Sequence, residues 1–262
     1  ILLTQLDKLI LSNILPLAEY GYFALVAVVS LGISQISGTI SQAILPRMTY
    51  FLSQGKSREM MLLYRQSTQI MSIIIMPITG MVALFSTELL FAWTGDIVAA
   101  KWASPILFWF ALGSGILSIS AFQYYLQFAH GMLKMHVIYN SISASIQIPI
   151  IIYVAFEYGA EGVAVSWFTL RLISFIIWTP IVHNKFAPGI HWPWLIKDIL
   201  PVFLSTLVLI LLFNSASIGF DEMNRLGVFA TLLSLGLVSL IVNIFVSKVG
   251  RDLVYTALKK SV

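Results

Sequence analysis

The sequence has 262 residues, of which 59% are apolar and only 10% are charged, and its mean hydropathy is +0.93. A soluble domain of this size has about 25% charged residues, so the composition excludes an ordinary soluble protein and indicates an integral membrane protein. The sequence contains no Cys, which excludes disulfides, a thiolate nucleophile and Cys metal ligands. The net charge of +4 comes from segments on one side of the predicted spans, so it indicates orientation and not nucleic-acid binding.

Apolar stretches of about 20 residues recur along the chain, and each is long enough to cross roughly 30 Å of hydrocarbon. They are continuous rather than alternating, which predicts helices and argues against barrel strands. The first stretch begins at Ile1 with no basic segment or signal-peptide pattern before it, so we expect the C-terminal part of a longer transporter-like chain. In chain order we predict about eight transmembrane helices, at residues up to about 15, 20–45, 67–93, 102–129, 136–156, 162–182, 195–213 and 226–246.

The connections between these helices are short, so the function must be carried out within the membrane. Segment 47–66 is the longest and predicts a short interfacial helix. Most of the 15 Lys and Arg residues lie in alternate connections and in the C-terminal tail, whereas Lys101 and Arg225 lie on the other side with most of the acidic residues. The positive-inside rule then predicts that the basic side and the C-terminus are cytoplasmic.

Signatures of enzymes are missing from the sequence. It has no GxxxxGK[ST] phosphate loop, no HExxH metal motif and no GxSxG nucleophile elbow. The four His residues lie near predicted cytoplasmic loops, and their spacing does not place two imidazoles on one helix face; we expect interfacial His side chains at positions 130, 136, 183 and 191. We therefore expect a protein that is not an enzyme and holds no metal or cofactor.

Arg171 stands near the centre of the sixth predicted helix, with Trp167 and Ser174 on the same face. A charge at this depth costs at least about 2.5–3.5 kcal/mol and usually faces the interior of a bundle or a watery cavity. Its guanidinium could bind a phosphate group through two parallel hydrogen bonds. The alternative is a structural Arg that pairs with a neighbouring helix.

Thr4, Asp7, Lys8 and Ser12 form a polar face on the first predicted helix, because their spacing follows the helical repeat. This face could line a central aqueous cavity, where Asp7 would relay a proton or bind a cation and Lys8 would contact an anionic substrate. The alternative is an ion pair between helices, such as one between Asp7 and Arg171.

Two further helices carry uncharged polar stripes. Ser120, Gln123, Tyr124 and Gln127 share a face of the fourth predicted helix, and Asn140, Ser143 and Gln147 share a face of the fifth. These side chains could line the same cavity and contact a substrate. Hydrogen bonding between helices explains them equally well.

Six short segments stand out along the chain, namely QLDKLILS at 5–12, EYGY at 19–22, LPR at 45–47, SQGK at 53–56, TELLFAWTG at 87–95 and GAEGVA at 159–164. Together they resemble the Wzx-type polysaccharide flippases of the multidrug/oligosaccharidyl-lipid/polysaccharide (MOP) exporter superfamily. The resemblance implies an all-α polytopic membrane protein of two six-helix lobes, like the multidrug exporters of the superfamily. Residues 1–185 would be the C-terminal lobe with a truncated first helix, residues 186–262 would add two helices and a basic cytoplasmic tail, and the N-terminal lobe would lie outside this chain.

The resemblance also implies a function. A flippase of this type moves an undecaprenyl-pyrophosphate-linked oligosaccharide from the cytoplasmic to the periplasmic leaflet of the bacterial inner membrane, for O-antigen or other lipopolysaccharide and surface polysaccharide biosynthesis. Other polysaccharide-assembly membrane proteins would be its partners, and coupling to H⁺ or Na⁺ stays open. The nearest rival is a cation-coupled multidrug exporter of the same superfamily. It should carry acidic cavity residues, whereas Asp7 here stands against two bases, Lys8 and Arg171.

Overall fold

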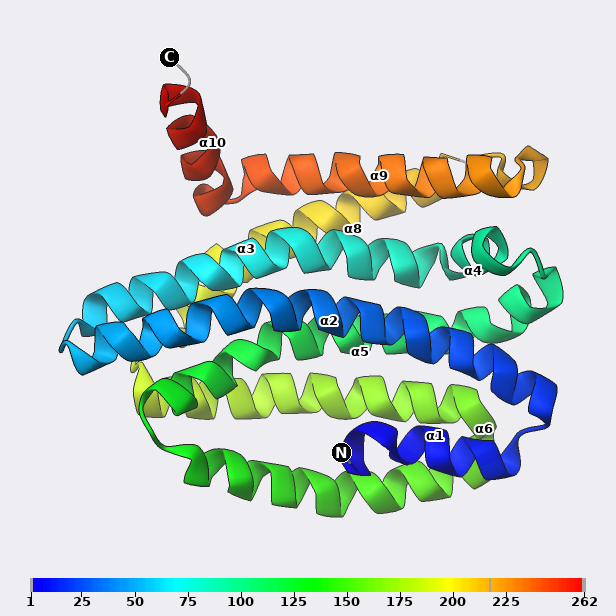
Figure 1. Ribbon diagram of the computed structural model, residues 1–262, viewed down its shortest axis with the longest axis horizontal. Helices are drawn as coiled ribbons and strands as arrows, with labels where there is room; N and C mark the ends of the chain where they lie inside the picture. Colours follow the sequence, from blue (N-terminus) through cyan, green and yellow to red (C-terminus); the bar gives the residue numbers. More distant parts are fainter. Residues whose placement is uncertain (1, 217, 261–262) are drawn as a thin grey trace.

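The computed structural model describes residues 2–216 and 218–260, without the side chains of 2–5, 221 and 260, and this part of the chain is helical without any strand (Figure 1). The elements in order are α1 (Leu2–Ile14), α2 (Leu17–Ser53), α3 (Ser57–Leu84), α4 (Ser86–Thr94), α5 (Ile97–Ala129), α6 (Leu133–Phe186), α7 (His191–Trp194), the π-helix η1 (Leu195–Ile199), α8 (Leu200–Ser215), the 3-10 helix η2 (Phe220–Glu222), α9 (Arg225–Val246) and α10 (Lys248–Lys260).

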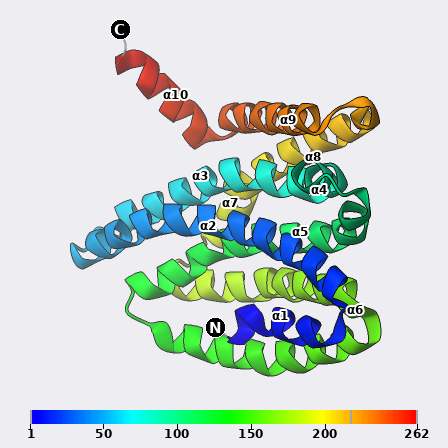
Figure 2. The same ribbon diagram turned by 45° about the vertical axis from the view of Figure 1, so that its right-hand side comes forward.

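The molecule is an all-α protein with several membrane-spanning helices. In the described residues, 6 helices are long and apolar enough to cross a membrane, namely α2, α3, α5, α6, the continuous helix His191–Ser215 and α9. Helix α6 is interrupted at Gly159, whose φ of 63° and ψ of −153° are not helical, and the ribbon turns back on itself there (Figures 1 and 2). Its two antiparallel arms, 133–158 and 160–186, fall on the fifth and sixth predicted helices. The full set of eight crossings stays a prediction, because α1 has only 13 residues.

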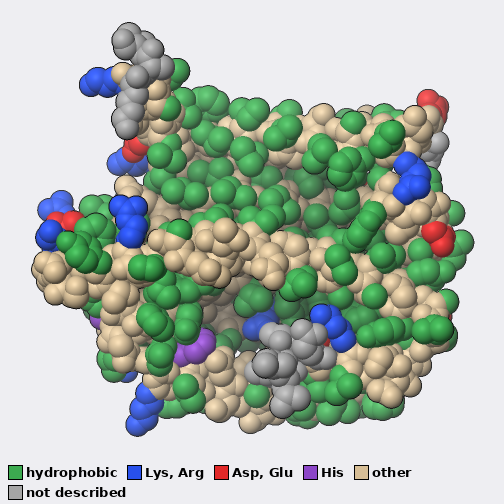
Figure 3. Space-filling view, in the orientation of Figure 1, with side chains coloured by type: hydrophobic (Ala, Val, Ile, Leu, Met, Phe, Trp, Pro, Cys, Tyr) green, Lys and Arg blue, Asp and Glu red, His purple; other side chains and the backbone are tan. Residues whose placement is uncertain are grey.

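The connections alternate between the two ends of the bundle, as the sequence predicts. The turns after Ser53, Ala129, Phe186 and Val246 lie at one end, and the turns after Ile14, Thr94, Gly159 and Ser215 lie at the other (Figure 1). We call the first the basic end and the second the acidic end. In Figure 3, charged side chains gather at both ends, and basic side chains also lie in the middle of the face shown. Which end faces the cytoplasm stays a prediction.

The predicted interfacial helix at 47–66 is wrong. Helix α2 runs through Pro46 to Ser53, and α3 begins at Ser57 after a tight turn in which Gly55 has a φ of 70°. A proline removes only one backbone donor, and neighbouring helices can hold such a helix together. The predicted third helix is also divided, because the chain leaves the helical path at Phe85, between α3 and α4.

Two large apolar cores hold the helices together. One lies towards the basic end and joins α2, α3, α5 and the second arm of α6 around Tyr64 and Trp194; the other lies towards the acidic end and joins α1, α2, α5 and α6 around Leu11 and Phe23. The first arm of α6 is covered least, with large apolar side chains such as Val137 and Tyr153 exposed. A smaller core packs α8 and α9 against α3 and α4.

Candidate functional site

A cavity of about 250 Å³ lies between α5 and the two arms of α6. Gln123 comes from the part of α5 nearer the basic end, Asn140 from the first arm of α6, and Arg171 from near the middle of the second arm. Ser120 and Ser174 add hydroxyl groups to the lining. Because the Asn140 side chain is exposed, the cavity is bordered on that side by the surface of the protein.

Arg171 packs against an aromatic ring and forms no ion pair with the side chains that the structure describes. Its guanidinium carbon lies 5.3 Å from the centroid of the Trp167 ring, within the range of a cation–π interaction. Trp167 fits against Gly113 of α5 so closely that a Cβ on this glycine would lie 2.2 Å from the indole ring. Because Gly113 has no side chain, the Trp167 ring can lie against α5, where its face is close to the guanidinium of Arg171.

Three buried polar atoms beside the cavity have no hydrogen-bond partner among the described residues. They are Nε of Arg171, Oε1 of Gln123 and Nε1 of Trp178, which are two donors and one acceptor. Most buried polar groups in folded proteins are hydrogen-bonded, and an exception at a cavity calls for water or a ligand. The cavity can thus receive a small polar group, with a preference for a negative charge near Arg171.

Aromatic side chains form the wall of the cavity towards the basic end. Tyr124 lies 4.6 Å from His136 and Tyr139 stacks on Trp178 at 4.7 Å, both measured between ring centroids. The Tyr139 hydroxyl also hydrogen-bonds with Ser174, which joins the two arms of α6 beside the cavity. The site therefore combines one cation, uncharged polar groups and flat aromatic faces.

The structure brings together five residues that the sequence predicts for the site, Ser120, Gln123, Tyr124, Asn140 and Arg171. Two other members of the polar stripes lie elsewhere. Gln127 is buried and donates a hydrogen bond to the Gln123 carbonyl 3.2 Å away, and Gln147 is buried with its Nε2 unpaired within the described chain. Neither side chain lines the cavity.

The described members of the polar face of α1 do not line this cavity. Asp7 is buried, Lys8 is half-buried, and Ser12 is exposed and donates to the Leu9 carbonyl 2.9 Å away. The side chain of Thr4 lies outside the described residues. The alternative of an ion pair between Asp7 and Arg171 is wrong for this structure, because the described side chains form one salt bridge and it joins other residues.

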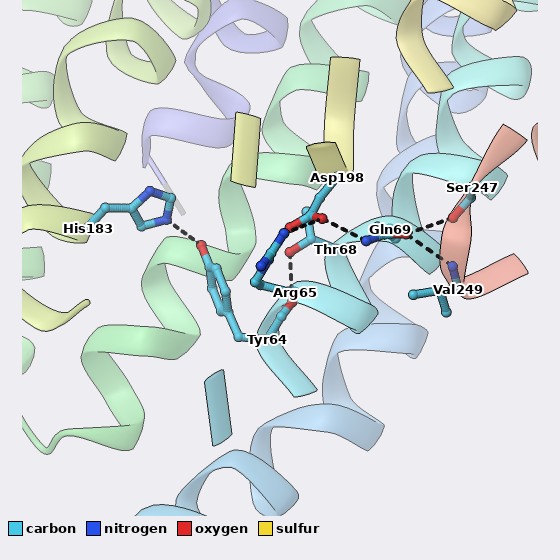
Figure 4. A network of polar contacts seen from close by, with 8 residues as sticks. All are labelled: Tyr64, Arg65, Thr68, Gln69, His183, Asp198, Ser247 and Val249. Atoms are coloured by element: carbon cyan, nitrogen blue, oxygen red, sulfur yellow. Dashed lines mark hydrogen bonds and ion pairs between the residues drawn. The ribbon is translucent and has the colours of Figure 1, made fainter. Parts of the chain in front are cut away.

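That salt bridge belongs to a second polar cluster near the basic end, shown in Figure 4. Arg65 of α3 binds the buried Asp198 of η1 through two hydrogen bonds of 2.5 and 2.8 Å, and Gln69 donates a third to the same carboxylate at 2.7 Å. Bidentate Arg–carboxylate pairs are the strong ones. Because Asp198 is fully bonded within the chain, this cluster joins helices and is a poor ligand site.

A row of aromatic groups lies beside the Asp198 cluster. The Tyr64 hydroxyl and Nε2 of His183 are 2.6 Å apart, and Nδ1 of His183 lies 3.1 Å from Nδ1 of His191. His183 is fully buried and lies near the end of α6, and its position at the membrane interface stays a prediction. Sequence reasoning missed Asp198; a lone carboxylate at the start of an apolar run, with arginines elsewhere at the same end, is the signal that could have found it.

Within the described residues, no group of three or more His, Asp or Glu side chains could hold a metal ion. No protein-family model matches the sequence, and no curated protein matches it significantly. The fold and the apolar helices thus define an all-α, multi-pass membrane protein. Any more specific assignment depends on the chemistry of the cavity.

Proposed function

We propose that this chain is part of a flippase for a lipid-linked oligosaccharide, and that Arg171 binds the pyrophosphate of the substrate. One observation carries the proposal: the half-buried side chain of Arg171, whose buried Nε has no hydrogen-bond partner among the described residues, lines a polar cavity in a membrane helix bundle. A cation in such a place is costly and is usually tied to function. The resemblance to Wzx-type flippases supports the same reading.

The chemistry of the cavity suits a phosphate group. The planar guanidinium can give two parallel hydrogen bonds to phosphate oxygens, and Trp167 supports its far face. Asn140 and Trp178 offer further donors nearby. Together these groups would lower the cost of moving a pyrophosphate through hydrocarbon.

The size of the cavity limits which part of the substrate it can hold. Its volume of about 250 Å³ is below the roughly 300–1,000 Å³ of sites that enclose a drug-sized ligand. We therefore assign it to the pyrophosphate alone. The sugars and the prenyl chain would extend past exposed Asn140, along the sparsely covered first arm of α6.

The proposal includes the setting that the resemblance implies. The substrate would be an undecaprenyl-pyrophosphate-linked repeat unit of O-antigen or another surface polysaccharide, moved between leaflets of the bacterial inner membrane with the C-terminus in the cytoplasm. Residues 1–185 would form one lobe of a two-lobe transporter that works by alternating access, residues 186–262 would add two helices and a tail, and an N-terminal lobe would complete the cavity.

The test uses the natural full-length protein, reconstituted in vesicles with a labelled polyprenyl-pyrophosphate oligosaccharide. We expect exchange of the substrate between leaflets in the wild type and its loss in Arg171→Ala. The matched control is Arg47→Gln, which removes a cation from an exposed position on α2 outside the cavity. Helix content and gel-filtration profile must be unchanged in both variants.

Two results would contradict these expectations, and each has a different meaning. Exchange that survives Arg171→Ala would keep the flippase reading and make Arg171 a structural residue. A wild type without exchange would overturn the function. The next probe would then be a cationic drug, because buried Asp7 is the feature that the rival multidrug exporter requires.

A further inference from the structure

The C-terminal helix α10 has two chemically different sides. Its sequence is KVGRDLVYTALKK, and a helical repeat places the apolar residues on one side and most of the charged ones on the other. The apolar side carries Val249, Leu253, Val254, Ala257 and Leu258, and the charged side carries Lys248, Arg251, Asp252 and Lys259. Leu253 is 56% exposed and Ala257 is exposed, so the bundle leaves most of this apolar side uncovered.

The direction of α10 is fixed by a tight corner at the end of α9. Gly250 approaches α9 so closely that a Cβ would lie 2.2 Å from the Ile244 carbonyl oxygen. Arg251 donates from Nη1 to the carbonyls of Phe245 at 2.8 Å and Val246 at 3.0 Å, which are left without helical partners where α9 ends. As a result α10 turns away from the line of α9 in both views (Figures 1 and 2).

The corner is also anchored to α3. Oε1 of Gln69 accepts hydrogen bonds from the Ser247 hydroxyl at 2.8 Å and from the backbone of Val249 at 3.2 Å (Figure 4). The same amide donates to Asp198, so one buried side chain connects the start of α10 to the Arg65–Asp198 pair. A loose tail would not need a buried polar anchor of this kind.

We propose that α10 is a membrane-surface helix that lies in the headgroup region of an anionic leaflet. The spanning helix α9 ends at Val246 and α10 begins at Lys248, which puts α10 at the boundary of the hydrocarbon. Leu253 and Ala257 enter the acyl chains, and Lys248 and Lys259 stand beside lipid phosphates. An amphipathic helix with a basic polar side binds anionic lipids both by burying its apolar side and by electrostatic attraction to the headgroups. The inference does not depend on what the protein transports.

The first test uses the natural absence of Cys in this chain. An environment-sensitive fluorophore is attached to Leu253→Cys, and separately to Tyr255→Cys on the polar side, in the full chain in nanodiscs containing phosphatidylglycerol. Both faces of such a bilayer are open to solvent. We expect aqueous iodide to quench the label at 253 several-fold less than the label at 255, and lipids with quenchers on their acyl chains to show the reverse. Equal quenching by iodide at both positions would overturn the proposal.

The second test separates an anionic lipid from a protein partner. In the Leu253→Cys background, Lys248→Gln with Lys259→Gln should increase iodide quenching of the label in anionic nanodiscs. Lys101→Gln, at the acidic end, is the matched control and should have no effect. If the label is protected from iodide equally in purely zwitterionic nanodiscs and in the double variant, and acyl-chain quenchers do not reach it, another protein surface covers α10 and the lipid assignment is wrong.

Discussion

Gly113 of α5 and the ring of Trp167 in α6 fit together without room for a single methyl group, since a Cβ on the glycine would lie 2.2 Å from the indole. This contact sets the position of the aromatic face on which Arg171 rests. Through it, the packing of two helices controls the geometry of the candidate site.

Gly113→Ala should therefore displace Trp167 and destabilise the protein. Overfilling a packed core typically costs about 1–3 kcal/mol, so we expect the melting temperature in detergent to fall by several degrees and the affinity for a short polyprenyl pyrophosphate to fall with it. Gly32→Ala is the control, because a Cβ there meets nothing within 4 Å. Equal melting temperatures for the two variants would contradict the close fit.

The planar geometry of the Arg171 guanidinium, and not only its charge, should matter for binding. Arg171→Lys keeps the cation but cannot give two parallel hydrogen bonds in one plane. We expect intermediate affinity for farnesyl pyrophosphate in Arg171→Lys and no measurable binding in Arg171→Gln, measured by thermophoresis on the purified protein. If Lys at 171 binds as well as Arg, the site recognises charge alone.

Water should reach position 140, which lines the cavity, but not position 127, which is buried outside it. In the Cys-free chain, Asn140→Cys should react with a membrane-impermeant thiol reagent, because Asn140 is an exposed lining residue. Gln127→Cys should be protected, since Gln127 is fully buried. Pre-incubation with pyrophosphate should slow the labelling at 140. A fast reaction at 127 would show that α5 packs differently.

Breaking the Arg65–Asp198 pair from one side should destabilise the basic end. Removing one partner of a buried pair typically costs about 3–5 kcal/mol; the cost here should fall below this range for Arg65→Gln, because the Arg65 side chain is 31% exposed and Gln69 still bonds the carboxylate. Arg65→Gln combined with Asp198→Asn should lose less than the sum of the single variants in thermal unfolding. Strict additivity would mean that the two groups do not interact.

The Tyr64 hydroxyl should also contribute to stability through His183. Tyr64→Phe leaves a buried imidazole nitrogen without its partner, at a cost of about 1–3 kcal/mol. The control is Tyr50→Phe, because Tyr50 is 58% exposed on α2. A thermal unfolding series on both variants checks this, and an unchanged melting temperature for Tyr64→Phe would contradict a stabilising hydrogen bond.

The sequence predicts much of the helical layout, because long apolar runs are a local signal. It also indicates the polar faces that carry Gln123, Asn140 and Arg171, since helical spacing places residues on a common side. It cannot show which faces meet. Lys8 and Arg171 are equally conspicuous as intramembrane cations, yet only Arg171 lines the cavity. Asp198 was missed because its partners lie more than a hundred positions away in α3.

Helix α6 has a consequence for how the chain enters the bilayer. Its arms are joined at one non-helical residue, Gly159, so that they form a tight helical hairpin. The second arm alone would bring Arg171 into lipid at a cost of at least about 2.5–3.5 kcal/mol. We expect the two arms to insert together as a hairpin, because Tyr139 and Asn140 of the first arm line the same cavity as Arg171 of the second. The first arm would then shield the guanidinium from lipid during insertion.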